Sequence, residues 1–178
     1  MKKTGVALLC LMLAACSGGS PDSHYYTLSA VGPATAPAPG KPQFRLAGVH
    51  LPSIYDRPQM VVRTGPQSVE INEFDRWAEP LERMTARTLA QDIALRRPQH
   101  PGPISAEQQK LQVSVDEFAA DRSGMARLSG SWKITGIDNQ VSAGEFAYSK
   151  PVEAGHPENV AAAMSALLGQ LADEFDRN

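Results

Sequence analysis

The sequence Leu111-Gln112-Val113-Ser114-Val115-Asp116 alternates apolar and polar residues, which is the period of a β-strand with one buried face. Two polar turns follow it, at residues 121–124 and 136–139. The stretch between these turns carries small or apolar residues at every second position: Ala126, Leu128, Gly130, Trp132 and Ile134. A further strand is expected from Gln140 to Tyr148. These segments predict a three-stranded antiparallel meander. The alternation changes phase near Phe118, which indicates either a bulge or the end of the ladder.

Two segments with helical periodicity flank this meander. The clearer one, from Pro157 to Phe175, carries apolar residues along one face: Val160, Met164, Leu167, Leu168, Leu171 and Phe175. The other, from Glu79 to Arg96, places Ala86, Leu89, Ala90 and Ile93 on one face and leaves Arg83, Arg87 and Asp92 outside it. A helix with a single apolar face packs that face against the protein core. We therefore expect both helices to cover the sheet.

The first third of the chain predicts further strands. Residues 24–28 and 43–51 are rich in strand-forming residues, and a proline-rich linker at 31–42 separates them. Two short apolar runs, at 60–63 and 69–71, indicate a hairpin. The complete order of elements predicts an α+β fold, with a mainly antiparallel sheet and two helices packed on one face.

The amino terminus has the features of a secretory signal. Lys2 and Lys3 precede an apolar run that ends at Leu13 and is too short to cross a bilayer. The sequence Leu13-Ala14-Ala15-Cys16 resembles the bacterial lipobox. This resemblance implies acylation of Cys16, and Ser17 after it implies sorting to the outer membrane. We therefore expect a signal peptide at 1–15, a lipidated tether at 16–23 and a single α+β domain at 24–178, held at the membrane by several acyl chains.

Composition and motifs exclude several classes of function. The formal net charge of −2 becomes −4 when Lys2 and Lys3 leave with the signal, so nucleic-acid binding is not expected. Cys10 also leaves and Cys16 is used by lipid, so the mature domain has no disulfide. The sequence lacks nucleophile-elbow, phosphate-loop, dinucleotide and zinc-protease motifs, and its four histidines are scattered. We expect neither an enzyme nor a cofactor or metal site.

Three carboxylates, Glu73, Asp75 and Glu79, lie within seven positions. Such a cluster could support acid–base or calcium chemistry. Arg76 and Arg83 lie nearby in the sequence. An ion-paired surface is therefore the favoured interpretation.

Two stretches, residues 51–59 and 72–81, carry a resemblance to a known family. Together with the lipobox and Tyr25-Tyr26-Thr27-Leu28, they resemble the PqiC-like family of ABC-type transport auxiliary lipoproteins (paraquat-inducible protein C) over nearly the whole mature domain. The loop in that family commonly runs Leu-Pro-x-Tyr-Leu-Asp-Arg-Pro-Gln. This chain has Ile54-Tyr55 in place of Tyr-Leu, so the aromatic residue is displaced by one position. The matching residues are Asp56, Arg57, Pro58, Gln59, Trp77, Ala78, Glu79 and Leu81.

The resemblance implies an outer-membrane lipoprotein that faces the periplasm and works with an inner-membrane MCE-domain (mammalian cell entry) protein in intermembrane lipid transport. The chain would dock the periplasm-spanning partner. As a hypothesis, the partner-facing surface contains Tyr55, Asp56, Arg57, Trp77 and Glu79. A homo-oligomer is compatible with this function.

Other interpretations remain open at this point. Trp77 is also explained as a core anchor at the start of the first helix, and Asp56 with Arg57 as an internal pair that fixes the turn. A second class of function is a lipid-binding module that holds an acyl chain between sheet and helices, which requires a large apolar cavity. A third is an envelope hydrolase, which requires a nucleophile and a base brought together in a cleft.

Overall fold

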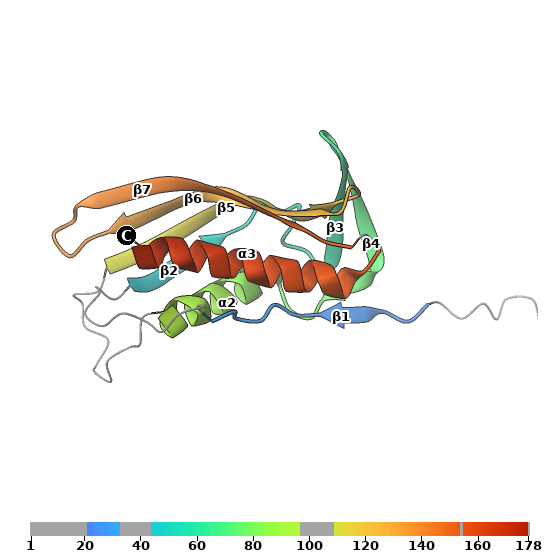
Figure 1. Ribbon diagram of the computed structural model, residues 1–178, viewed down its shortest axis with the longest axis horizontal. Coiled ribbons are helices and arrows are strands. Elements are labelled where there is room, and N and C mark those ends of the chain that lie inside the picture. The colour runs from blue at the N-terminus through green and yellow to red at the C-terminus, as the bar shows by residue number, and fades with distance from the viewer. Residues whose placement is uncertain (1–20, 33–43, 97–108, 154, 178) are drawn as a thin grey trace, which may run out of the picture.

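A computed structural model describes residues 21–32, 44–96, 109–153 and 155–177. The signal peptide, Cys16, most of the tether and most of the proline-rich linker lie outside these residues. Within the described ranges, no helix combines the length and the apolar character needed to cross a bilayer. Figure 1 shows the arrangement of the elements.

The described residues form a seven-stranded sheet in the spatial order β1-β4-β3-β5-β6-β7, with β2 also paired to β5. The strands are β1 (His24–Tyr26), β2 (Phe44–His50), β3 (Gln59–Gly65), β4 (Ser68–Trp77), β5 (Gln109–Asp121), β6 (Met125–Thr135) and β7 (Val141–Pro151). The predicted meander is confirmed, because β5, β6 and β7 are consecutive antiparallel neighbours. The predicted hairpin is confirmed as β3 and β4.

The α+β class and the mainly antiparallel sheet are confirmed, but the sheet is mixed rather than purely antiparallel. Three pairs are parallel: β1 with β4, β2 with β5, and β3 with β5. Parallel neighbours need long connections between them, and each of these pairs joins strands that are far apart in the sequence. Alternation along a strand shows which face is buried and carries no information about the partner, so the sequence could not reveal these pairs.

Strand β5 has two partners along one edge. Its first part, residues 109–114, pairs with β2, and its last two residues pair with β3. Between these two ladders lies the predicted bulge, a register shift between Val115 and Glu117 against β6. The chain bridges this gap in the edge with the loop of residues 52–58, which connects β2 to β3.

Both helices, α2 (Leu81–Arg96) and α3 (Pro157–Arg177), cover the same face of the sheet (Figure 1). The predicted stripe of α3 is confirmed, since its main members are buried: Met164, Leu167, Leu168, Leu171 and Phe175. The ring of Phe175 meets that of Trp132 on β6 edge to face, with centroids 5.9 Å apart. Helix and sheet therefore share one core.

The prediction for the inner face of α2 is partly wrong. Asp92, expected outside the apolar face, is fully buried, whereas Ala90 is exposed. The reason is a second neighbour of the helix, the extended segment of residues 27–32 that follows β1, which we call the strap. Asp92 faces the strap and accepts a hydrogen bond from the backbone N–H of Val31 at 2.7 Å. The burial of Asp92 thus depends on a segment distant in sequence.

Side chains of both helices hold the strap. The backbone N–H groups of Leu28 and Ser29 donate to Met84 Sδ on α2 (3.2 Å) and Ser165 Oγ on α3 (3.1 Å). Arg96 donates to the carbonyl of Val31 at 3.0 Å. The strap is therefore fixed to the helix layer by side chains, without a strand partner of its own in the described residues.

Candidate functional site

Loop 52–58 is a rigid turn beside the carboxyl end of β4. The backbone N–H groups of Tyr55 and Asp56 both donate to the carbonyl of Pro52, at 2.9 and 3.2 Å. The N–H of Trp77, the last residue of β4, donates to the carbonyl of Pro58 at 2.7 Å. The two stretches that carry the family resemblance are therefore joined directly, as the hypothesis of a shared surface requires.

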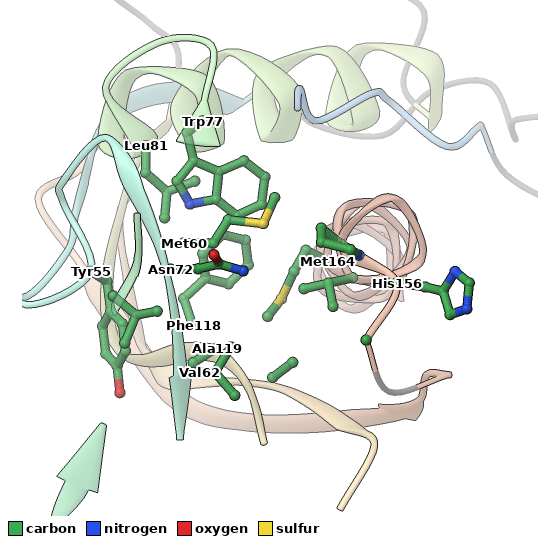
Figure 2. A pocket seen from close by; sticks show the side chains of 15 residues that line it. Tyr55, Met60, Val62, Asn72, Trp77, Leu81, Phe118, Ala119, His156 and Met164 are labelled. Carbon is green, nitrogen blue, oxygen red and sulfur yellow. The ribbon is translucent and has the colours of Figure 1, made fainter. Parts of the chain in front are cut away.

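Tyr55 and Trp77 are core residues. Both are buried, and both line a cavity of about 90 Å³ between sheet and helices, together with Met60, Phe118 and Met164 (Figure 2). Trp77 therefore serves as the core anchor that the sequence suggested. The hydroxyl of Tyr55 points away from the cavity.

The environment of the Tyr55 hydroxyl disfavours its ionised form. Burial raises the pKa of Tyr55, and the negative charge of Glu117 raises it further. The nearby guanidinium of Arg63 opposes both effects. Tyr55 thus stays neutral and has no feature of a catalytic base.

Asp56 caps helix α2. Its Oδ1 accepts a hydrogen bond from the backbone N–H of Glu82 at 3.0 Å, where a carboxylate satisfies an otherwise unpaired donor and interacts favourably with the helix dipole. Glu82 in turn accepts a hydrogen bond from the backbone N–H of Leu51 at 3.1 Å. The loop and the helix therefore fix each other.

The predicted internal pair between Asp56 and Arg57 does not form within the described residues, because Asp56 is turned toward α2. Arg57 is half-buried, and its Nε is shielded from solvent with no hydrogen-bond partner in the described part of the chain. The terminal guanidinium nitrogens of Arg57 remain the charged feature of this loop.

The carboxylates of segment 74–79 are engaged in contacts within the protein. Glu79 forms a two-oxygen ion pair with Arg87, at 2.5 and 2.7 Å. Asp75 accepts hydrogen bonds from Tyr26 (3.2 Å) and Asn72 (2.5 Å). The predicted ion-paired surface thus exists, with Arg87 in place of Arg76 and Arg83. Among the described residues, no group of acidic or histidine side chains is arranged to hold a metal ion.

Asn72 was not identified from the sequence. It lies on β4 and is a polar member of the cavity lining. His156, at the start of α3, also belongs to the lining but is directed away from the cavity (Figure 2). No sequence motif marked either residue.

The size of the cavity bears on the alternative of a lipid-binding module. Ligand pockets usually enclose about 300–1,000 Å³, so a cavity of about 90 Å³ argues against an acyl chain held between sheet and helices. In the two joined stretches, Ile54 and Phe74 are large apolar side chains that are 39% and 41% exposed.

Comparison with known proteins adds a family. A model of the ABC-type transport auxiliary lipoprotein component matches residues 26–175. The chain is 29% identical over 142 residues to the intermembrane transport lipoprotein PqiC of Escherichia coli. The aligned region covers 75% of this chain and 74% of that protein. The protein of the same name from Shigella flexneri aligns equally well.

Two crystal structures share the fold. One, of an uncharacterized protein, superposes with a TM-score of 0.75 at 18% identity and covers 88% of this chain and 98% of that one. The other, of a protein from Xanthomonas campestris, gives a TM-score of 0.70 at 22% identity and covers 86% of this chain and 93% of that one.

Proposed function

The chain belongs to the family of ABC-type transport auxiliary lipoprotein components, and from this premise we propose that it is a non-enzymatic accessory subunit of an intermembrane lipid transport system. It is anchored in the outer membrane through Cys16 and faces the periplasm. Its task is to dock the MCE-domain protein that spans the periplasm from the inner membrane.

The sequence before β1 supports the anchor. The lipobox ends at Cys16, and only eight positions separate Cys16 from the first residue of β1, His24. At about 3.3–3.6 Å per residue, this stretch reaches roughly 26–29 Å when fully extended. A body held this close to one membrane cannot cross the periplasm, so a partner has to bridge the distance.

Loop 52–58 and segment 74–79 support the docking surface, and the hydrogen bond between Trp77 and Pro58 is the observation that carries it. Tyr55 and Trp77 shape the surface from below, while Asp56 and Glu79 hold it through Glu82 and Arg87. Ile54, Phe74 and Arg57 supply the contacts. Exposed apolar side chains and a partly buried arginine are residue types that interfaces use for binding.

Crosslinking in intact cells tests the docking surface. A photo-reactive residue at position 54 or 74 should capture the MCE-domain protein of the same bacterium, and Ile54→Asp or Phe74→Asp should abolish pull-down of that protein. Val141→Asp is the matched control, because Val141 is also an exposed apolar residue (57%) but lies on β7. Equal loss in all three variants, or loss in none, contradicts the assignment, provided that thermal unfolding shows each variant to be folded.

Mass spectrometry of the amino-terminal peptide tests the anchor separately. A mature chain that begins with acylated Cys16 is expected, and Cys16→Ser should leave the protein unprocessed or released from the membrane fraction. An unmodified Cys16 in the mature chain contradicts the anchor and leaves the docking surface to be judged by crosslinking alone.

A further inference from the structure

An exposed line of side chains runs along the outside of the helix layer. From β1 into the strap, burial alternates: Tyr25, Thr27, Ser29 and Val31 are exposed, whereas Leu28 between them is buried. Tyr25 is 63% exposed, the second largest value among the exposed large apolar side chains of the described residues. Such side chains, when they gather in one place, mark an interaction surface.

These residues form one wall of a groove. The groove has a volume of about 480 Å³ and is lined on the opposite side by α3. Apart from Glu158, the α3 residues that line it are small, namely Ala161, Ala162 and Ser165, and leave room between helix and strap. Ser165 is already satisfied, since its hydroxyl accepts from Ser29 and donates to the carbonyl of Ala161 at 2.8 Å. The floor of the groove is therefore apolar, because the hydroxyl of Ser165 already has its hydrogen-bond partners.

The position of the groove relative to the tether identifies what covers it. Its first residue, Tyr25, lies two positions after Ser23, the last residue of the short tether from Cys16. A tether of this length holds the groove at high effective concentration beside the membrane, so weak apolar contacts are sufficient for association. Tyrosine is enriched at the level of lipid headgroups, where its ring is buried and its hydroxyl stays hydrated.

The opposite face of the molecule has a different character. The outward residues of the sheet are polar or charged, for example Gln112 and Asp116 on β5, Lys133 on β6 and Glu145 on β7. One carboxylate, Glu158 on α3, borders the groove itself. A surface with apolar walls and an acidic border fits zwitterionic lipid better than anionic lipid.

We propose that the groove between the strap and α3, with Tyr25 at its entrance, lies against the headgroup region of the membrane that holds the lipid anchor. The inference rests on the proposed acylation of Cys16 and goes beyond it. The anchor alone fixes one point, whereas this contact sets the orientation of the whole body. The polar face of the sheet then points into the periplasm.

Quenching by brominated lipid tests the orientation in the full acylated chain. The chain is reconstituted into vesicles of phosphatidylethanolamine and dibrominated phosphatidylcholine, and a tryptophan is introduced by Tyr25→Trp. The matched control is Ile137→Trp, because Ile137 is 64% exposed and lies in the turn between β6 and β7. Figure 1 shows this turn and β1 at opposite ends of the molecule. The native Trp77 and Trp132 are buried and give a constant background.

The expected result is loss of the added fluorescence of the Tyr25→Trp chain and unchanged fluorescence of the Ile137→Trp chain. Equal quenching of both, or quenching of neither while mass spectrometry shows acylated Cys16, overturns the proposed contact and leaves the anchor intact. An unmodified Cys16 overturns the anchor and this inference together. Crosslinking at position 54 or 74 reports on docking independently of all these outcomes.

Discussion

Replacing Asp92 with alanine removes the buried carboxylate that joins helix α2 to the strap. The Asp92 side chain is 0% exposed, and its Oδ1 accepts hydrogen bonds from the N–H of Val31 (2.7 Å) and from Arg96 Nη1 (3.1 Å). Breaking a buried ion pair costs about 3–5 kcal/mol, because the remaining charge stays buried. Arg96 keeps a hydrogen-bonded contact to Asp173 at 2.6 Å, so we expect a loss near the lower end, about 3 kcal/mol.

The free energy of unfolding, measured in guanidinium chloride, gives the answer when a second ion pair serves as control, formed by Glu79 just before α2 and Arg87 on α2. This control pair also joins a carboxylate to an arginine, but the side chains of Glu79 and Arg87 are 36% and 41% exposed. Exposed pairs contribute about 1 kcal/mol or less, so Glu79→Ala should be mild. If Asp92→Ala costs no more than Glu79→Ala, Asp92 does not hold the strap.

The pH dependence of stability, compared between the wild-type chain and Asp92→Asn, gives a second test of this carboxylate. Burial is the largest influence on Asp92 and raises its pKa above 3.8, against the opposing effects of the Val31 N–H and of Arg96. A raised folded-state pKa means that the folded chain binds the proton more tightly than the unfolded chain. The stabilising contribution is therefore complete below pH 3.8 and declines as the pH rises through the folded-state pKa. Relative to Asp92→Asn, the wild-type chain should lose stability over this window, and a gain would refute the reasoning.

Three further changes test other parts of the fold. In Gly130→Ala, the added Cβ would lie 2.1 Å from the carbonyl oxygen of Ser114 and 2.9 Å from Val115 Cα. We expect the free energy of unfolding, measured by chemical denaturation, to fall by about 3 kcal/mol. Gly48→Ala is the control and should be nearly neutral, because no atom lies within 4 Å of its added Cβ. Ser165→Ala removes the acceptor of the Ser29 N–H and should cost about 1 kcal/mol, with faster hydrogen exchange at Ser29. Hydrogen bonds from Ser123 and Met125 lower the pKa of Asp121. Its contribution is therefore present above its usual pKa and lost as the pH falls through the lowered one, and Asp121→Asn should flatten the acid limb of the stability curve.

The parts of the fold that depend on neighbours in sequence were predictable. The β5–β7 meander and α3 could be predicted because their periods of two and 3.6 residues extend regularly over long segments, and because each strand of the meander pairs with the next one. The parallel pairs were not predictable. His24 pairs with Asp75 across 51 positions, and the sequence of neither strand identifies the other as its partner.

The same distinction applies to the candidate site. The core position of Trp77 follows from its type and its place before a helix, and it is confirmed. The burial of Tyr55 could not be read from its loop, because it depends on the gap that β2 and β3 leave along the edge of β5. Asp92 is a comparable case: its partner Arg96 is four residues away, but the strap that covers both comes from the other end of the chain.

The strap has a mechanical consequence for a chain pulled at its amino end. Traction enters at His24 and first loads the three-residue ladder between β1 and β4. Beyond it, the load passes to the hydrogen bonds at Ser29 and Val31, which transmit it in shear to α3 and α2. In a chain pulled in this way, the helices therefore share the tension with the ladder between β1 and β4.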